Sequence, residues 1–228
     1  MNPDQWRAYL VTQQSLSAGR STEEIVEAAI EGGIDAVQLR EKGTSAQHRI
    51  ELGERLRELT GEAGVDLIVN DRIDIAYAIG ADGVHLGQSD PSVSTARELL
   101  GPAATIGVSV STVSEARLAA ISGADYLGVG AVYGTDSKPD AETAEAGLGV
   151  DELAKIVDAV TIPVVAIGGV TPENAGGPIQ AGATGVAVIS AITAADDPET
   201  AARGLREAVT AGREKTEEGD EEEVAADD

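Results

Sequence analysis

Short apolar runs alternate with longer amphipathic segments along the whole chain. Several runs, such as 66–70 and 185–190, are nearly continuous in Val, Ile and Leu, which is typical of parallel strands buried on both faces. This pattern predicts strands at 8–12, 35–39, 66–70, 83–86, 104–108, 125–130, 163–168 and 185–190.

The intervening segments carry helix signals. The stretch "STEEIVEAAIEGG" (21–33) opens with a capping serine and an acidic first turn, and it closes with glycine. Segments 45–64 and 198–212 follow the same pattern. Eight strands alternating with eight helical stretches predict an α/β fold, a single-domain (β/α)8 TIM barrel. A doubly wound open sheet is the alternative, but no GxGxxG follows an early strand and polar groups follow nearly every strand end.

Composition limits where the protein functions. The 228 residues include no Cys, which excludes disulfides and thiolate metal sites and suits a reducing interior. No run of 18 apolar residues occurs, and the N-terminus lacks a basic region followed by an apolar one. We therefore expect a cytoplasmic protein without a membrane partner. Because Phe is absent while Ala, Gly and Val are abundant, we also expect a small, aliphatic core.

The chain is strongly acidic, with 40 acidic residues against 16 basic ones and a net charge of -24. Nucleic acid is excluded as a partner because phosphate backbones require a basic surface. The segment 214–228, with nine acids and one lysine, is predicted to be a disordered tail on a catalytic domain at 1–213. Without it, 31 acidic residues against 15 basic ones still leave -16. Because salt screens such repulsion, we expect a halophilic protein; an ordinary acidic protein is the alternative.

Polar and charged residues cluster just past the predicted strands, where barrel active sites form. They are Gln38, Arg40, Lys42, Asn70, Asp71, Arg72, Gln88, Asp90, Ser109, Thr135, Ser137 and Lys138, and they are joined by Gly168 and Gly169 after the seventh strand and by Ile189 and Ser190 at the end of the eighth. Only four lysines occur in the chain, and two of them are in this set. Cations kept on so acidic a surface indicate that an anion is bound there.

The residue types at these positions suit phosphate. Arg40 offers a planar fork, and Lys42 and Lys138 offer point charges. Asp71 and Asp90 are hard oxygen ligands of the kind that Mg²⁺ prefers. We expect one anion site around these residues and a second at the backbone N–H groups that follow the last two strands. The plainer alternatives are that both aspartates cap helices and that Arg40 pairs with surface carboxylates.

The motifs "VQLREKG", "NDRIDIAYAIGADGVHLGQSD", "IGVSVST", "GTDSKPDA" and "VVAIGGVTPENAGGPIQAGATGVAVISAI" occur in this order. Through them the chain, from about residue 8 to 195, resembles the thiamine phosphate synthase family. The resemblance implies a transferase with one Mg²⁺ per subunit. It would condense 4-amino-2-methyl-5-(diphosphooxymethyl)pyrimidine with 4-methyl-5-(2-phosphooxyethyl)thiazole to thiamine monophosphate. Diphosphate would be released in a Mg²⁺-assisted dissociative substitution.

The resemblance also implies roles for single residues. Those for the pyrimidine diphosphate are Gln38, Leu39, Arg40, Glu41, Lys42, Asn70, Ser109 and Lys138. Those for the thiazole phosphate are Thr135, Asp136, Ser137, Gly169, Ile189 and Ser190. The implied metal ligands are Asp71 and Asp90, and the implied catalytic cations are Lys138, Arg40 and Lys42.

The loop that follows the sixth strand departs from the family pattern. It reads "TDSK" (135–138) where the family has Thr-x-Thr-Lys. Serine keeps the hydroxyl, whereas Asp136 places a negative charge beside a substrate phosphate. The length and glycines of 131–147 also suit a lid.

Two other functions are compatible with the fold. A thiazole tautomerase-like paralogue would need a general acid/base but no diphosphate and Mg²⁺ site. A non-catalytic, thiamine-precursor-binding regulatory barrel would be expected to lose the cation set, which this chain retains. We expect His85 to be a packed, hydrogen-bonded barrel residue instead of a general base. The sequence leaves the oligomeric state open, with a homo-oligomer as one option.

Overall fold

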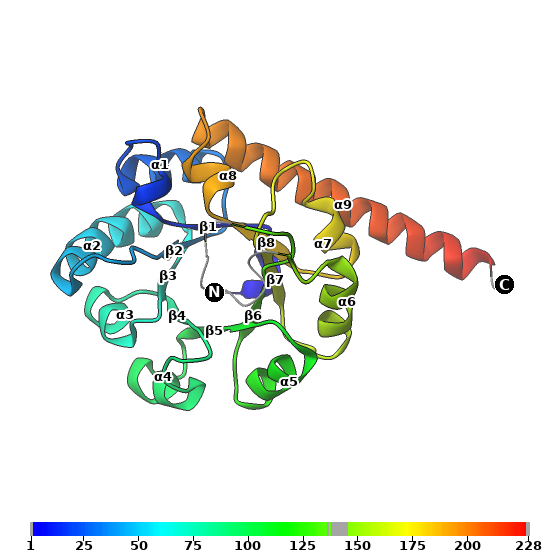
Figure 1. Cartoon of the computed structure of the whole chain (residues 1–228), viewed down its shortest axis with the longest axis horizontal. Helices are drawn as coiled ribbons and strands as arrows, with labels where there is room; N and C mark the ends of the chain where they lie inside the picture. Colours follow the sequence, from blue (N-terminus) through cyan, green and yellow to red (C-terminus); the bar gives the residue numbers. More distant parts are fainter. Residues whose placement is uncertain (1, 136, 138–145, 227–228) are drawn as a thin grey trace.

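The computed structural model describes residues 2–135, 137 and 146–226, with side chains as far as residue 216. Within these residues the strands form a closed parallel barrel in the order β1 to β8, and the helices surround it (Figure 1). The predicted (β/α)8 barrel is thus confirmed. No helix in this described part of the chain is long and apolar enough to cross a membrane.

All the predicted strands are present, and their ends differ from the predicted ones by at most two residues. They are β1 (Ala8–Val11), β2 (Ala36–Leu39), β3 (Asp66–Asn70), β4 (Gly83–Leu86), β5 (Thr105–Val110), β6 (Tyr126–Val129), β7 (Val164–Ile167) and β8 (Gly185–Val188).

Four helices, α1, α2, α4 and α5, begin at capping residues that the sequence provides. Ser21 and Thr112 form complete capping boxes, and Ser45 and Ser92 accept backbone N–H groups of the first turns that follow them. The helices are α1 (Thr22–Glu31), α2 (Ala46–Ala63), α3 (Ile73–Ile79), α4 (Val93–Leu100), α5 (Val113–Ile121), α6 (Val150–Asp158), α7 (Gly176–Gln180), α8 (Ser190–Thr193) and α9 (Pro198–Ala226).

The acidic segment from residue 214 continues α9 as helix to Ala226, and Figure 1 shows the helix extending beyond the barrel. The division into a catalytic domain at 1–213 and a disordered tail stays a prediction. Glu, Ala and Lys are good helix formers, so a segment too polar to pack can still adopt helical backbone.

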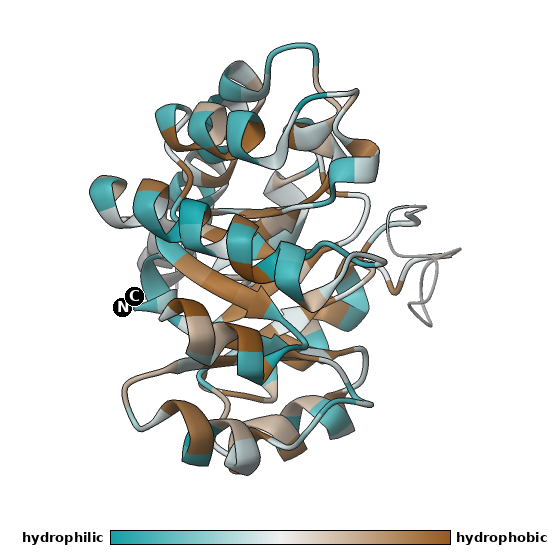
Figure 2. Ribbon diagram, turned by 90° about the vertical axis from the view of Figure 1, so that its left-hand side faces the viewer, coloured by the Kyte–Doolittle hydropathy of each residue, from teal (hydrophilic) through white to brown (hydrophobic). Residues whose placement is uncertain are grey.

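The core consists of two layers with different chemistry. Between strands and helices lie aliphatic side chains such as Leu10, Leu67 and Ile106, as the composition predicts. The barrel interior instead holds aromatic residues, with Trp6 stacked edge-on against Tyr126 at 4.9 Å between ring centroids. The expectation of a wholly aliphatic core is therefore wrong for the inner layer. Figure 2 shows the apolar strands inside and the polar surfaces of the helices outside.

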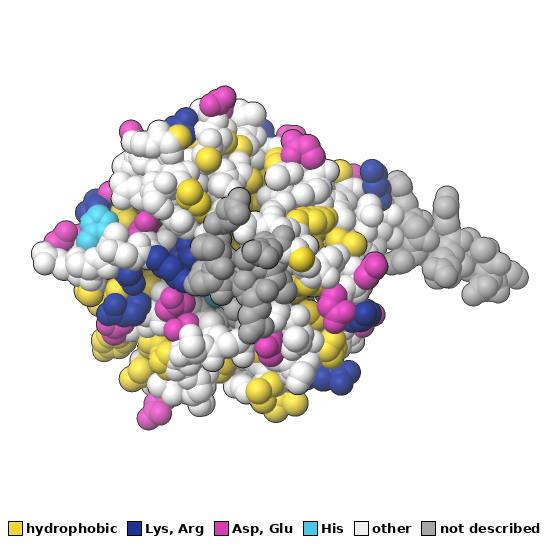
Figure 3. Space-filling model, viewed as in Figure 1, with side chains coloured by type: hydrophobic (Ala, Val, Ile, Leu, Met, Phe, Trp, Pro, Cys, Tyr) yellow, Lys and Arg dark blue, Asp and Glu magenta, His cyan; other side chains and the backbone are white. Residues whose placement is uncertain are grey.

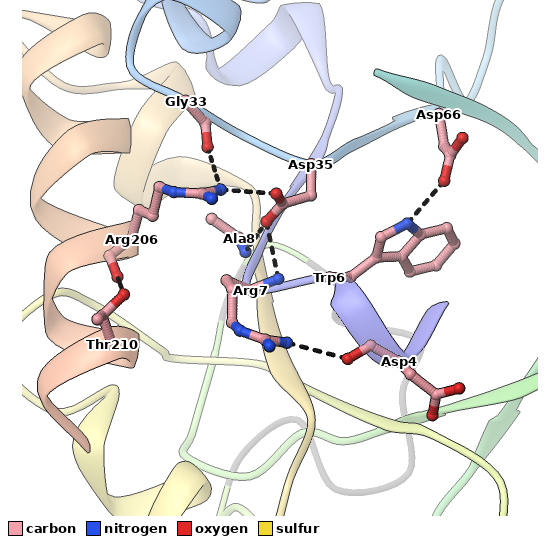
Figure 4. Close-up of polar contacts among 9 residues, drawn as sticks. All are labelled: Asp4, Trp6, Arg7, Ala8, Gly33, Asp35, Asp66, Arg206 and Thr210. Carbon is pink, nitrogen blue, oxygen red and sulfur yellow. Dashed lines mark hydrogen bonds and ion pairs between the residues drawn. The ribbon is translucent and has the colours of Figure 1, made fainter. Parts of the chain in front are cut away.

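The N-terminal end of the barrel is closed by an ionic cluster (Figure 4). Asp35 accepts hydrogen bonds from the N–H groups of Arg7 and Ala8 at 2.8 and 3.0 Å, and it pairs with Arg206 of α9 at 2.6 Å. Beside it, the indole of Trp6 donates to Asp66 at 2.8 Å. Burial raises the pKa of the Asp66 carboxyl, and the indole hydrogen bond opposes that rise. These contacts hold β1 and α9 at the end of the barrel opposite the predicted site.

Candidate active site

Two adjoining cavities open at the C-terminal ends of the strands. The charged cavity, about 430 Å³, is lined by residues that follow β2 to β5, including Arg40, Lys42, Asp71 and Asp90. The glycine-rich cavity, about 270 Å³, is lined by residues that follow β6 to β8. Ser109 and Gly130 line both. In Figure 3 basic and acidic side chains gather beside the barrel mouth, on the side of β2 to β4.

The segment "QLREK" divides between the cavity and the scaffold by strand alternation. Side chains of successive extended residues point to opposite faces. Arg40 and Lys42 line the charged cavity, and Gln38 points into the barrel interior. Leu39 packs in the aliphatic core, and Glu41 accepts hydrogen bonds from Gln14 N–H and from Thr22 at 3.0 Å each. The side chains of Leu39 and Glu41 therefore do not belong to the cavity.

Arg40 is held by the scaffold while its charge faces the cavity. Only 4% of the residue is exposed, its backbone N–H donates to the Thr12 hydroxyl at 3.0 Å, and its guanidinium contacts Gln13. Lys42, by contrast, is exposed. The plainer alternative, that Arg40 pairs with surface carboxylates, stays a prediction.

Asp71 and Asp90 form a carboxylate pair. They lie close enough to share a hydrogen bond, and both line the charged cavity. Burial, and then the charge of Asp90, raise the pKa of the Asp71 carboxyl, while Lys42 and Arg40 oppose the rise. Asp71 also has a φ of 63°, a left-handed conformation that is rare outside glycine and clusters at functional sites.

Neither aspartate caps a helix. The N-cap residue of α3 is Arg72, without a side-chain cap, and Ser92 caps α4. Asp90 instead accepts the Gly87 N–H at 2.6 Å. Helix capping, the plainer prediction for both, is therefore wrong.

The donor set at the pair suits Mg²⁺. No cluster of three or more His, Cys, Asp or Glu occurs in the described ranges, so the site has the form of a carboxylate pair. Mg²⁺ is commonly held by one or two carboxylates, with water and substrate phosphate as the other ligands. The two cationic side chains in the same cavity would face that phosphate.

Polar residues line the centre of the cleft, and a hydrogen bond there joins the segments that follow neighbouring strands. Ser109, at the junction of the two cavities, accepts a hydrogen bond from Gln88 at its carbonyl at 2.6 Å. Asn70, the last residue of β3, lines the charged cavity with Gln88. This places both predicted residues, Asn70 and Ser109, in the cleft.

The glycine-rich cavity brings together the loops that follow β6, β7 and β8. Thr135, Ser137, Gly169, Ile189 and Ser190 all line it. The Ser137 hydroxyl donates to that of Ser190 at 3.3 Å, and Ser190 begins α8, where the first N–H groups have no intrahelical acceptor. At Gly169, φ is +66° and a Cβ would lie 2.6 Å from the carbonyl oxygen of Gly134. A side chain there would clash with the backbone and narrow the cavity.

Two predicted residues, Asp136 and Lys138, lie outside the described residues, as does most of the proposed lid. Their roles remain predictions from the sequence. On either side of them the loop is anchored, because Tyr133 N–H donates to Gly168 O and Leu148 N–H to Ala131 O.

His85 is the packed barrel residue that the sequence predicts. It is 5% exposed, and its two ring nitrogens lie 2.9 Å from the Tyr126 hydroxyl and 2.8 Å from the Ser109 hydroxyl. Sequence reasoning missed Tyr9 and Tyr126, which lie beside it in the barrel. The signal that could have found them is the glycine in mid-strand at Gly107 and Gly128, which often marks a close approach.

The barrel and its two adjoining cavities define a TIM-barrel protein with a small-molecule site at the strand ends. Comparison with known proteins identifies which kind. A family model described as "Thiamine monophosphate synthase" matches residues 8–192, and the chain belongs to that family.

Curated relatives named "Thiamine-phosphate synthase" match almost the whole chain. The protein from Haloarcula marismortui is 60% identical, covering 91% of this chain and 99% of its own length. The one from Moorella thermoacetica is 52% identical, with 92% and 99% covered. A solved structure titled as a thiamine phosphate pyrophosphorylase from Pyrococcus furiosus is 39% identical, with a TM-score of 0.83, covering 92% of this chain and 98% of that one. These similarities indicate a transferase.

Proposed function

We propose that this protein joins a pyrimidinylmethyl diphosphate to a thiazole phosphate, forming thiamine monophosphate and releasing diphosphate. The observation that carries the proposal is the pair of adjoining cavities with Ser109 at their junction. One cavity is lined by two cations and by the Asp71–Asp90 carboxylate pair, and the other is lined by glycines and the start of a helix. The names of the relatives support the same reaction.

The residues of the charged cavity would bind and orient the diphosphate. Arg40 offers two parallel N–H donors to phosphate oxygens, and Lys42 adds a second positive charge. As the carbon–oxygen bond breaks, the electron pair leaves with the diphosphate. Positive groups already in place stabilise that charge without reorganising. We assign the same role to Lys138 from the sequence.

The glycine-rich cavity would hold the thiazole phosphate. Backbone N–H groups at Gly169 and Ser190 and the hydroxyls of Thr135 and Ser137 are suited to its oxygens. Because the two cavities adjoin, the thiazole nitrogen would face the carbon that loses diphosphate and supply the electron pair of the new carbon–nitrogen bond. Holding both reactants together removes much of the entropic cost of their encounter.

Asp71 and Asp90 would hold one Mg²⁺, which when bound neutralises charge on the diphosphate oxygens. Burial, and then the charge of Asp90, raise the pKa of Asp71, and a cation between the two carboxylates would relieve their repulsion.

The alternative functions suit the site less well. A thiazole tautomerase-like enzyme needs a free general acid/base, whereas both ring nitrogens of His85 are engaged by hydroxyl groups. A regulatory function without catalysis would not explain why the buried Arg40 lines the same cavity as the Asp71–Asp90 pair.

The direct test is diphosphate release from the two substrates with Mg²⁺. We expect release to depend on the thiazole phosphate, on the pyrimidine diphosphate and on the metal. Thiazole-independent release would contradict the proposed reaction, and binding of both ligands without release would favour the regulatory barrel.

A paired substitution tests the cation set. We expect Lys138→Ala to lower turnover by roughly 10²-fold or more, in line with the loss of a preorganised charge. Lys155→Ala is the matched control, because Lys155 lies on the outer surface of α6 and pairs with Glu152 at 2.8 Å. Equal turnover in the two variants would remove Lys138 from the mechanism.

A further inference from the structure

A continuous chain of hydrogen bonds crosses the barrel interior beneath the cleft. The Gln38 amide nitrogen donates to the Tyr9 hydroxyl at 2.9 Å, and the Tyr9 and Tyr126 hydroxyls lie 3.2 Å apart. Tyr126 then contacts His85 Nδ1 at 2.9 Å, and His85 Nε2 contacts Ser109 Oγ at 2.8 Å. The first four residues are at most 5% exposed, whereas Ser109 lines both cavities.

With the Gln38 amide nitrogen as the first donor, the hydrogen bonds can all run one way. Tyr9 then accepts from Gln38 and donates to Tyr126, which in turn donates to His85 Nδ1. An imidazole that accepts at Nδ1 carries its proton on Nε2, which would donate to Ser109. Burial raises the pKa of both tyrosines far enough that each phenol keeps the proton it donates.

This direction fixes what Ser109 presents to the cleft. Because Ser109 Oγ accepts from His85, its own hydroxyl proton is left to point toward a bound molecule. At the far end, Gln38 Oε1 is buried without a hydrogen-bond partner in the described structure.

Two glycines on neighbouring strands leave room for the side chains of this hydrogen-bond chain. A Cβ on Gly107 would lie 2.5 Å from the Tyr126 hydroxyl, and one on Gly128 would lie 2.8 Å from His85 Cε1. Both strands therefore lack side chains where the two rings approach them.

We propose that Tyr9, Tyr126 and His85 are positioning residues that hold Ser109 as a hydrogen-bond donor and Gln38 Oε1 as an acceptor for the pyrimidine substrate. The three residues act through the two ends of the chain and do not touch the reacting atoms. The assignment to that substrate rests on the proposed function, whereas the direction of the chain does not.

The direction can be measured without substrate or activity. The chain has only two histidines, His48 and His85, so ¹⁵N-histidine labelling gives two imidazole systems that a His48→Gln variant tells apart. At neutral pH we expect His85 to show a protonated Nε2 and an unprotonated Nδ1. A protonated Nδ1, alone or with Nε2, would overturn the assigned direction.

Tyr126→Phe tests whether the hydrogen-bond chain contributes to the reaction. It keeps the ring packed on Trp6 and removes the hydroxyl that joins Tyr9 to His85. We expect His85 to lose its single tautomer and the KM for the pyrimidine diphosphate to rise about tenfold, the equivalent of about one hydrogen bond. The KM for the thiazole phosphate should change much less.

The matched control is Tyr77→Phe, which removes a hydroxyl from a tyrosine that is 73% exposed on α3. It should leave tautomer, KM values and unfolding temperature unchanged. If Tyr126→Phe lowered the unfolding temperature but left the KM values unchanged, the hydrogen-bond chain would only stabilise the fold. That result would overturn the positioning role of Tyr9, Tyr126 and His85. If the wild-type protein released no diphosphate, the proposed function would fail while the tautomer result would still stand.

Discussion

Asp71 combines an unfavourable backbone conformation with an unfavourable charge environment. For most L-residues the left-handed region costs about 1–2 kcal/mol, whereas Asn and Asp tolerate it better. Its carboxyl also lies beside Asp90 in a partly buried cavity. Both features are costly to the fold, which points to selection for binding at this position.

Substitutions at Asp71 separate the two features. In Asp71→Asn the new residue still tolerates the left-handed backbone conformation, but the negative charge is removed. We expect unchanged or slightly raised stability without metal, and turnover lowered by roughly 10²-fold or more. Asp71→Ala should be less stable than Asp71→Asn by about 1 kcal/mol, because alanine tolerates this φ poorly. Thermal unfolding and diphosphate release measure the two effects.

Asp74→Asn is the control for this pair of variants, since Asp74 is a nearby exposed aspartate whose partner is Arg72. It should not change turnover. An Asp71→Asn enzyme with normal turnover and normal Mg²⁺ dependence would contradict the metal assignment.

At the scale of elements, a short motif recurs at the start of the strands. A left-handed glycine is followed by an apolar residue and then by Asp or Thr, at 33–35, 64–66, 80–82, 123–125 and 182–184. In four of the five, the polar side chain accepts the N–H of the first or second residue of the preceding strand. The acceptors are Asp35 for β1, Asp82 for β3, Asp125 for β5 and Thr184 for β7. The odd strands are thus fastened by the residue that introduces the next strand.

Asp82 is a suitable test of this fastening. It accepts the Leu67 N–H at 2.8 Å and pairs with Arg57 of α2 at 2.5 Å. We expect Asp82→Ala to cost about 2–3 kcal/mol of unfolding free energy, because a backbone N–H and a guanidinium lose their acceptor. Asp82→Asn keeps a neutral acceptor and should cost less.

Denaturant unfolding gives the free energies, and kinetics well below the unfolding temperature provide the control. Asp82 lies at the end of the barrel opposite the cleft, so turnover and KM should match the wild type. A normal unfolding free energy for Asp82→Ala would refute the fastening role.

The strands and the cleft residues could be predicted because each signal is local. A Val- and Ile-rich run identifies a strand such as β8, and the residues just past it must lie at one end of a parallel barrel. The series of hydrogen bonds that leads from Gln38 to Ser109 could not be predicted. Two of its members, Tyr9 and Tyr126, are 117 residues apart in the sequence and meet only in the closed barrel. The orientation of Leu39 and Glu41 away from the cavity was predictable in principle from strand alternation.

At the scale of the whole molecule, the two ends of the barrel have separate tasks. The N-terminal end contains ion pairs and the Trp6 cluster, which stabilise the fold. The C-terminal end contains the costly features, namely paired carboxylates, a left-handed aspartate and a buried arginine. Changes at one end should therefore affect stability and changes at the other activity.

The net charge gives the prediction that concerns the molecule as a whole. Residues 1–213 have 31 acidic and 15 basic residues, so repulsion is spread over the folded surface and is not confined to the tail. Raising KCl from about 0.1 M to about 1 M shortens the Debye length from roughly 10 Å to roughly 3 Å. We therefore propose a salt-adapted protein whose unfolding temperature rises steeply over this range.

Two comparisons separate charge screening from other effects of salt. A variant ending at residue 213 loses nine acids and one lysine, and we expect it to keep most of the salt dependence, because a charge of -16 remains. A second variant, with several exposed glutamates such as Glu54 and Glu62 of α2 changed to Gln, should need less KCl for the same unfolding temperature. A salt dependence unaffected by these Gln changes would mean that ion-specific hydration, not repulsion among carboxylates, sets the stability of this protein.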